Sequence, residues 1–395
     1  MLADMTAGPI RERAAAHAAD VLGLLERLVA QESVEGSPGI GACLAIIAER
    51  LEGAAATVER LDFGGVPALI ARVGEGDPAR RLTFSGHVDV VPASGGWRSP
   101  PFRLTERDGR LHGRGTCDMK AGVAATVEAV RVVAELGLLS EVAVELALTG
   151  DEEVGSEHGT RALLAGGWIT GRSAICCEPT GLDVFLGNRG LVWADVVVAG
   201  RGGHAGMAHA LANPIDAAAA LIDALNAIPL TARDDRFDPP VPTLTLTRVQ
   251  ADGGGRNVVP DRVELGLDRR LLPGEDPDAA VAEIGSAIQA TVRPPFAAEM
   301  SVGRRWPPYA IDAGRPVAQT ATAAVRAAGR EPVYGMDSAA NDSSWLDAAG
   351  IDTVLLGPGE PTQAHATDES VDPADVTAAV AVYAHLMAGT AAAVV

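Results

Sequence analysis

The chain has 395 residues, 47% of them hydrophobic and 21% charged, which excludes a disordered protein and favours two domains with buried cores. Its formal net charge is -20, and the acidic residues are spread along the chain, so the basic patch that nucleic-acid binding requires is missing. Because the sequence has four cysteines without a disulfide pattern, no signal peptide and no apolar stretch of about 18 residues, we expect a cytoplasmic protein without membrane spans.

The first part of the chain alternates between helical and strand patterns. The apolar spacing predicts helices over residues 14–30, 40–52, 121–136 and 160–164. It predicts strands over residues 55–61, 68–73, 81–85, 141–148 and 173–177. This alternation is typical of an α/β domain whose sheet is largely parallel and flanked by helices.

A different pattern begins at Asn188. Strands are predicted over residues 191–198, 243–249 and 262–267, with helices over 214–228 and 278–292. The alternation of helices and strands seen in the first part of the chain then resumes. Its helices are predicted over 314–328, 339–348 and 373–388, and its strand over 352–356. We therefore expect a catalytic domain made of residues 1–187 and 298–395, and a smaller α+β domain inserted over residues 188–297.

Polar side chains follow several of the predicted strands, and the carboxyl ends of parallel strands are where functional groups gather. His87 ends one strand, and Asp89 could accept a hydrogen bond from its second ring nitrogen. Asp118 lies among glycines before a helix, where it could cap the helix or bridge two metal ions about 3.5–4 Å apart.

The adjacent carboxylates Glu152 and Glu153 follow another apolar strand. Buried together without cations they would repel, whereas a metal ion and a water molecule would give each of them a partner. On an exposed loop the pair would simply be solvated. Glu178 and His365 add oxygen and nitrogen ligands that suit zinc, cobalt or manganese.

In combination these fragments resemble the M20 metallopeptidase and deacylase family, close to its acetylornithine deacetylase and succinyl-diaminopimelate desuccinylase branch. The resemblance covers essentially the whole chain, and the motifs that carry it are Gly86–Pro92, Gly113–Lys120, Asp151–Ser156, Glu178-Pro179 and His365.

The resemblance implies two divalent metal ions bridged by Asp118, most simply zinc, with cobalt or manganese as alternatives. His87 and Glu178 would complete one set of ligands, and Glu153 and His365 the other. It also implies that Glu152 is the general base and that Asp89 orients His87.

For the inserted domain the resemblance implies a lid and a dimerisation surface. His204, in the segment Arg201–Gly206, would stabilise the oxyanion in the active site of the partner subunit. Four further positions are implied to bind substrate: Asn257, Arg270, Gly357 and Gly359. Arg269 competes with Arg270, because strand alternation turns only one of the two inward.

The expected activity is the removal of an acetyl- or succinyl-type N-acyl group from an amino acid by attack of a metal-bridging hydroxide. The expected partners are a small N-acyl amino acid and a second copy of the chain in a homodimer. Glu rather than Asp at position 178 favours this deacylase branch. An M20-type dipeptidase or carboxypeptidase, and a non-catalytic metal-binding protein of the same fold, are the alternatives.

Overall fold

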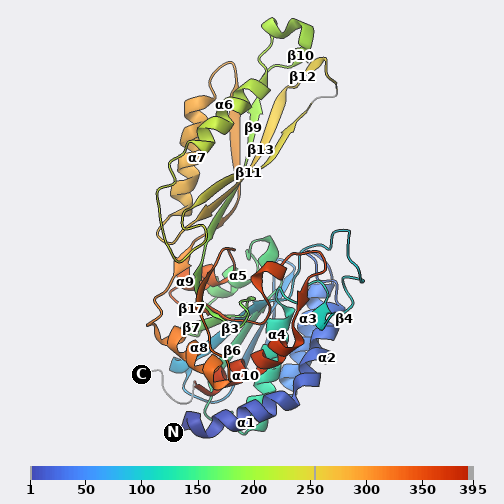
Figure 1. Ribbon diagram of the computed structural model, residues 1–395, viewed down its shortest axis with the longest axis vertical. Helices are drawn as coiled ribbons and strands as arrows, with labels where there is room; N and C mark the ends of the chain where they lie inside the picture. Colours follow the sequence, from blue (N-terminus) through green and yellow to red (C-terminus); the bar gives the residue numbers. More distant parts are fainter. Residues whose placement is uncertain (1, 253–254, 390–395) are drawn as a thin grey trace. The chain divides into compact units, whose positions relative to one another are not determined.

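The structure is a computed structural model that describes residues 2–252 and 255–389 (Figure 1). It divides into two compact units, one made of residues 1–187, 311–335 and 345–395 and the other of residues 188–310 and 336–344. The second unit continues beyond the expected boundary at 297, because strand β14 (Ala297–Trp306) pairs with β9 (Gly190–Ala199). The proline pair at 294–295 therefore precedes a strand of this unit.

The first unit is built on a mixed sheet with the strand order β1-β2-β6-β3-β7-β17-β8-β15, and β16 also pairs with β8. The central strands β6, β3, β7 and β17 run parallel, whereas β1, β2 and β8 are antiparallel to their neighbours. The predicted α/β class with a largely parallel sheet is thus confirmed. The strand bounds are β1 (Thr57–Phe63), β2 (Val66–Val73), β3 (Leu82–His87), β6 (Val144–Thr149), β7 (Ser173–Cys176), β8 (Val184–Asn188), β15 (Tyr309–Ala310), β16 (Tyr334–Asp337) and β17 (Asp352–Leu355).

Helices cover both faces of this sheet. On one face, α4 and α10 pack against each other and are surrounded by α1, α2 and α8 (Figure 1). On the other face, α5 and α9 contribute Leu163 and Leu346 to a cluster with Ile70 and Ala174 of the sheet. The helix bounds are α1 (Leu2–Ala16), α2 (Ala18–Val29), α3 (Gly39–Glu52), α4 (Lys120–Glu135), α5 (Thr160–Ala165), α8 (Pro316–Ala327), α9 (Ser343–Ala348) and α10 (Pro373–Gly389).

Helix α4 packs closely on the chain that follows β7, and its first turns are rich in alanine and glycine. Every residue from Lys120 to Val130 is buried. A Cβ atom at Gly122 would collide with the carbonyl oxygen of Cys177, so glycine is required for this approach. This close packing brings the start of α4, and the loop before it, next to the chain that follows β7.

Two small sheets accompany these layers. β18 (Ser370–Val371), β5 (Arg110–His112) and β4 (Thr105–Arg107) form a three-stranded antiparallel sheet in the first unit. In the second unit, β10 (Gly203–His204) pairs with β12 (Val258–Val259). Within the described residues, no helix combines the length and the apolar character needed to cross a membrane.

The second unit is an antiparallel sheet with two helices on one face. Its strand order is β11-β13-β9-β14, with β11 (Thr243–Ala251) and β13 (Arg262–Leu271) beside the two strands already named. Helices α6 (Pro214–Asn226) and α7 (Pro277–Thr291) start with a proline in the first turn, and the side chains of Asn213 and Asp276 cap them. Their apolar sides pack on alternate residues of β9, such as Val196 and Val198.

Candidate metal centre

The carboxyl ends of three parallel strands deliver the first side chains of the centre. His87 is the last residue of β3, and Glu178 lies two residues beyond the end of β7. Glu152 and Glu153 follow β6 in a short 3-10 helix over Glu152–Val154. Because β6, β3 and β7 are adjacent and parallel, these side chains share one edge of the sheet.

Asp118 lies between two imidazoles. Its Oδ1 atom is 3.2 Å from Nε2 of His87, and its Oδ2 atom is 3.3 Å from Nε2 of His365. Helix α4 starts at Lys120, and its N-cap residue is Met119, which makes no side-chain cap hydrogen bond. The alternative role of Asp118 as a helix cap is therefore wrong, and both of its oxygens are directed to histidines.

The remaining carboxylates fall on the two sides of Asp118. Oε1 of Glu178 lies 3.7 Å from Nε2 of His87, whereas Oε2 of Glu153 lies 2.9 Å from Nε2 of His365. Oε2 of Glu152 is 3.9 Å from Nε2 of His87. His87 is 1% exposed, while the side chain of His365 is 54% exposed, so the centre opens to solvent on the His365 side.

Asp89 contacts the ring nitrogen of His87 that faces away from the centre, Nδ1. Nδ1 of His87 is 3.0 Å from the backbone carbonyl oxygen of Asp89 and 3.4 Å from its Oδ1 atom. Oδ2 of Asp89 accepts a hydrogen bond of 3.0 Å from the backbone N–H of Glu153. Because Nδ1 of His87 is held by this residue, Nε2 is the ring nitrogen that faces the centre, and it offers a lone pair to a metal ion once its proton is displaced.

Glu369 fixes the loop that carries Asp118, and the sequence patterns did not identify it. Its buried carboxylate accepts hydrogen bonds from the backbone N–H groups of Gly115, Cys117 and Asp118, at 2.8 to 3.0 Å. It also accepts one of 2.7 Å from the buried guanidinium of Arg114. One side chain therefore holds three backbone N–H groups of a single loop, residues 115–118, beside the centre. The available signal was an acidic residue four positions after His365.

The crowding of carboxylates and imidazoles shifts their protonation. Burial raises the pKa of Asp118, but hydrogen bonds from His365 and His87 outweigh it and hold the pKa well below its usual range. Hydrogen bonds to Asp118 and Glu153 raise the pKa of His365 to about 10. Burial raises the pKa of Glu153, against the hydrogen bond with His365. Without metal, the two imidazoles thus act as the cations of the centre.

The donor atoms of this centre suit a divalent metal ion. Ligand atoms of His87, Asp118 and Glu153 all lie within 4.8 Å of one another. Imidazole nitrogen and carboxylate oxygen are the ligands that zinc, cobalt and manganese accept, and the fixed tautomer of His87 is the one a metal ion needs.

A second group of side chains, His17, Asp20 and Glu128, also has closely spaced ligand atoms. Here Glu128 is already paired with Arg50 and Arg131, both at 2.7 Å. Because the guanidinium groups supply the positive charge, this group is an ion-pair network between helices.

The sequence as a whole matches the model of a known protein family. The family described as peptidase family M20/M25/M40 matches residues 83–389, more than three quarters of the chain. The chain belongs to this family. The resemblance found in the sequence motifs is thus confirmed, and the M20 family is one of hydrolases.

Relatives of this M20 chain carry the names of the predicted branch. Acetylornithine deacetylase of Myxococcus xanthus is 31% identical over 379 residues, which cover 92% of this chain and 96% of the relative. Succinyl-diaminopimelate desuccinylase of Gluconacetobacter diazotrophicus is 37% identical over 250 residues, which cover 60% of this chain and 63% of the relative.

The solved structure of the di-peptidase Dug1p from Saccharomyces cerevisiae is similar with a TM-score of 0.82. The sequence identity is 16%, and the match covers 99% of both chains. At this identity the similarity shows a shared fold.

Two of the residues expected to contact substrate lie together in the second unit of this M20 chain. His204 in β10 pairs with Val258 in β12, and the backbone carbonyl of the preceding Asn257 accepts a hydrogen bond from Ala205. Nδ1 of the exposed His204 accepts a hydrogen bond of 2.9 Å from the N–H of Gly206. This contact leaves Nε2 of His204 as the outward ring nitrogen.

Arg270 lies in the four-stranded sheet of this unit, near the C-terminal end of β13. Along β13, Arg262 pairs with Ala199 and Arg270 with Leu191, so eight residues, or about 26 Å, separate the two ends. His204 follows Ala199 in the chain and therefore belongs to the end away from Arg270. One chain does not bring His204 and Arg270 to the same small molecule.

The neighbouring arginines at 269 and 270 differ in their surroundings. Arg269 is 2% exposed and is paired with Glu275. The side chain of Arg270 is 29% exposed, and its Nε atom lies 2.8 Å from Oδ1 of Asp268. Arg270 is thus the one of the two that a ligand can reach.

The glycines that follow β17 are packed against the chain after β7. The N–H of Gly357 donates to Oγ1 of Thr180 at 3.2 Å, and its carbonyl accepts from the N–H groups of Thr180 and Leu182. Both the N–H and the carbonyl of Gly357 therefore form hydrogen bonds within the protein. A Cβ atom at Gly359, whose φ is +91°, would lie 2.6 Å from Sγ of Cys117. These positions thus require glycine for packing.

Replacing Glu369 with Gln tests how the Asp118 loop is held. The neutral amide leaves Arg114 buried without its charge partner and turns an N–H donor toward backbone N–H groups. We expect a loss of about 3–5 kcal/mol in unfolding free energy and a 10–100-fold weaker metal affinity. Thermal unfolding and zinc titration against a chelating dye measure both. Glu360→Gln, which breaks only the half-exposed pair with Arg110, is the control, and equal metal affinities of the two variants would contradict this role.

The raised pKa of His365 predicts that metal uptake releases protons. The proton on His365 stabilises the metal-free protein fully below about pH 6.5, and this contribution is lost as the pH rises through about 10. A metal ion must displace that proton, so zinc affinity is expected to rise with pH up to about 10. Adding zinc to metal-free protein at pH 7.5 with an indicator dye measures the release. His365→Ala should release fewer protons, and binding without release would contradict the prediction.

Proposed function

We propose that this protein is a metal-dependent amidohydrolase that removes an acetyl- or succinyl-type acyl group from the nitrogen of an amino acid. The single observation that carries the proposal is the position of Asp118, whose two oxygens face the Nε2 atoms of His87 and His365. One shared carboxylate between two imidazoles is the arrangement that a two-metal hydrolase needs. The names of the relatives, an acetylornithine deacetylase and a succinyl-diaminopimelate desuccinylase, support the substrate class.

We infer that the centre holds two divalent ions, with zinc as the first choice and cobalt or manganese as alternatives. Asp118 would bind both ions, with His87 and Glu178 on one side and Glu153 and His365 on the other. The spacings of 3.7 Å for His87–Glu178 and 2.9 Å for His365–Glu153 support this division. When bound, such ions polarise an amide carbonyl and lower the pKa of water toward 7.

The side chains around the centre then transfer protons and position the metal ligands. Glu152, 8% exposed, is the general base that accepts a proton from water and delivers it to the leaving nitrogen. Its burial strengthens this proton transfer because few water molecules compete for the carboxylate. Asp89 positions His87 through the contact with Nδ1, and Glu369 keeps Asp118 in place.

The second unit supplies substrate contacts, and two copies of the chain are needed to supply all of them. Arg270 binds a carboxylate of the substrate, with Asn257 and Gly359 as further contacts. His204 donates from Nε2 to the developing oxyanion. The separation of about 26 Å along β13 supports a homodimer in which His204 serves the partner's centre, because one substrate spans only a few ångströms.

We also propose that the protein works in the cytoplasm. All four cysteines, Cys43, Cys117, Cys176 and Cys177, are buried free thiols. Free thiols are the form expected in a reducing compartment.

A substrate panel tests the proposed function. The metal-loaded protein should hydrolyse N-acetyl and N-succinyl amino acids with kcat/KM values well above those for dipeptides of the same amino acids. Faster cleavage of dipeptides would assign the protein to the peptidase alternative. Absence of hydrolysis in the presence of zinc, cobalt and manganese would leave a metal-binding protein without catalysis.

Glu152→Gln is expected to lower kcat at least about 100-fold while the protein keeps its metal, because the amide cannot accept the proton. Steady-state kinetics on the best substrate and metal analysis by mass spectrometry measure the two effects. Glu157→Gln, which alters an exposed carboxylate paired with Arg161 in the same segment, is the control. A near-normal kcat in Glu152→Gln would refute the base assignment.

His204→Ala is expected to lower kcat about 100–1,000-fold with unchanged metal content. Mixing it with Glu152→Gln under conditions of subunit exchange should restore about one quarter of the wild-type activity. Half of the dimers are then mixed, and each has one intact site. His209→Ala, at an exposed histidine nearby, is the control that should leave kcat unchanged. Failure of the mixture to recover activity would show that His204 does not act across subunits.

A further inference from the structure

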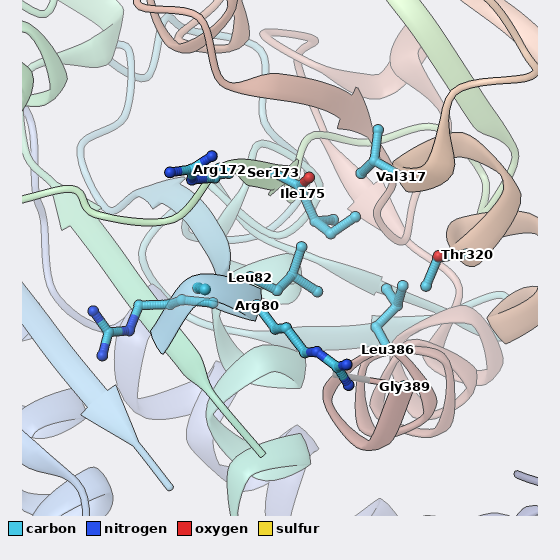
Figure 2. Close-up of a pocket in the computed structure, with 11 residues that line it drawn as sticks. Arg80, Leu82, Arg172, Ser173, Ile175, Val317, Thr320, Leu386 and Gly389 are labelled. Carbon is cyan, nitrogen blue, oxygen red and sulfur yellow. The ribbon is translucent and has the colours of Figure 1, made fainter. Parts of the chain in front are cut away.

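A cavity of about 180 Å³ lies in the first unit beneath the amino ends of two central strands (Figure 2). Leu82 begins β3 and Ser173 begins β7, and both line the cavity. Val317 and Thr320 of α8, with Leu386 of α10, complete its wall on one face of the sheet. An engineered apolar cavity of about 150 Å³ holds a benzene molecule, so this space is large enough for a small organic ligand.

The interior of the cavity is apolar. The side chains of Leu82, Ile175, Val317 and Leu386 gather around its centre (Figure 2). These four residues are buried in the fold, at 0 to 7% exposure. A hydrocarbon group placed among them leaves water and gains dispersion contacts, which favours binding.

The rim of the cavity is strongly cationic. Arg80, Arg81 and Arg172 line it, and none of the described residues that line it is acidic. Among the described residues, neither the Arg80 nor the Arg172 guanidinium has a carboxylate within ion-pair distance. Arg81 donates to Oγ1 of Thr170 at 2.6 Å.

This local charge is unusual for the chain, which has a formal net charge of -20 and 52 acidic residues. Several other exposed arginines have acidic partners, as Arg326 has Glu331 and Arg330 has Asp375. Three guanidinium groups without carboxylates around one apolar cavity therefore attract an anion, and their planar donor forks match a carboxylate.

We propose that this cavity is a binding site for a small carboxylic acid with a compact apolar body of about six to nine non-hydrogen atoms. The apolar body lies among the four apolar side chains, and the carboxylate pairs with Arg80 and Arg172 at the rim. Ser173 and Thr320 also line the cavity.

The site is separate from the metal centre. His87 ends the strand that Leu82 begins, and Glu178 follows the strand that Ser173 begins. Strands of this length span about 15–20 Å. The cavity therefore lies at the amino ends of these strands, and the metal centre lies at their carboxyl ends. A carboxylic acid in the cavity therefore does not compete with substrate for the metal centre.

Isothermal titration calorimetry of the metal-loaded protein with three probes of one shape tests this site. Benzoate, benzyl alcohol and benzylammonium share the apolar body and differ in charge. We expect benzoate to bind at one site per chain, at least tenfold more tightly than benzyl alcohol, with no binding of benzylammonium. Equal affinities of benzoate and benzyl alcohol, or no benzoate binding at millimolar concentration, would overturn the proposal.

Variants assign the binding to this cavity. Arg80→Ala combined with Arg172→Ala should weaken benzoate at least tenfold by removing the charge, and Thr320→Phe should abolish the site by filling it. Arg60→Ala, at an exposed arginine paired with Glu52 elsewhere in the unit, is the matched control and should bind benzoate as wild type does. Circular dichroism and metal content check that each variant is folded. Undiminished benzoate binding by the double variant and by Thr320→Phe would show that benzoate binds elsewhere and overturn the assignment.

Discussion

The structure depends on one electrostatic constraint, the convergence of carboxylates at a single edge of the sheet. The groups that meet there are Asp118, Glu152, Glu153 and Glu178, together with the imidazoles of His87 and His365. Four buried or nearly buried carboxylates repel one another unless cations lie between them. Protonated histidines supply part of that charge in the metal-free protein, and divalent ions would supply the rest. Burial strengthens the repulsion among these carboxylates, and it also strengthens their attraction for cations.

Backbone hydrogen bonds, more than side-chain packing, hold this arrangement in place. Parallel pairing of β6, β3 and β7 fixes where three of the loops begin. Glu369 then fixes the fourth loop by accepting three backbone N–H groups, and Asp89 ties the ring of His87 to the backbone of Glu153. Acceptors that bind several N–H groups at once restrict a loop without any regular secondary structure.

The fold class and the grouping of residues after strands could be predicted, because apolar periodicity defines strands and parallel strands share one carboxyl edge. Glu369 could not, because three of its four partners are backbone N–H groups about 250 positions away, and such groups leave no side-chain pattern. Strand β14 was missed because it follows two prolines that resemble a boundary. Helix spacing was equally consistent with Asp118 as a cap, and only coordinates exclude that role. None of these sequence patterns indicates which acyl group the substrate carries.

The order of the proposed ligands along the chain has a consequence for synthesis. His87, Asp118, Glu153 and Glu178 all precede the second unit, whereas His365 and Glu369 follow it. A nascent chain therefore exposes an incomplete set of acidic ligands while the second unit is being made and folded. The edge of the sheet cannot reach its final charge balance until the last of these residues leaves the ribosome. The complete set of proposed ligands is thus available only after both units have been translated.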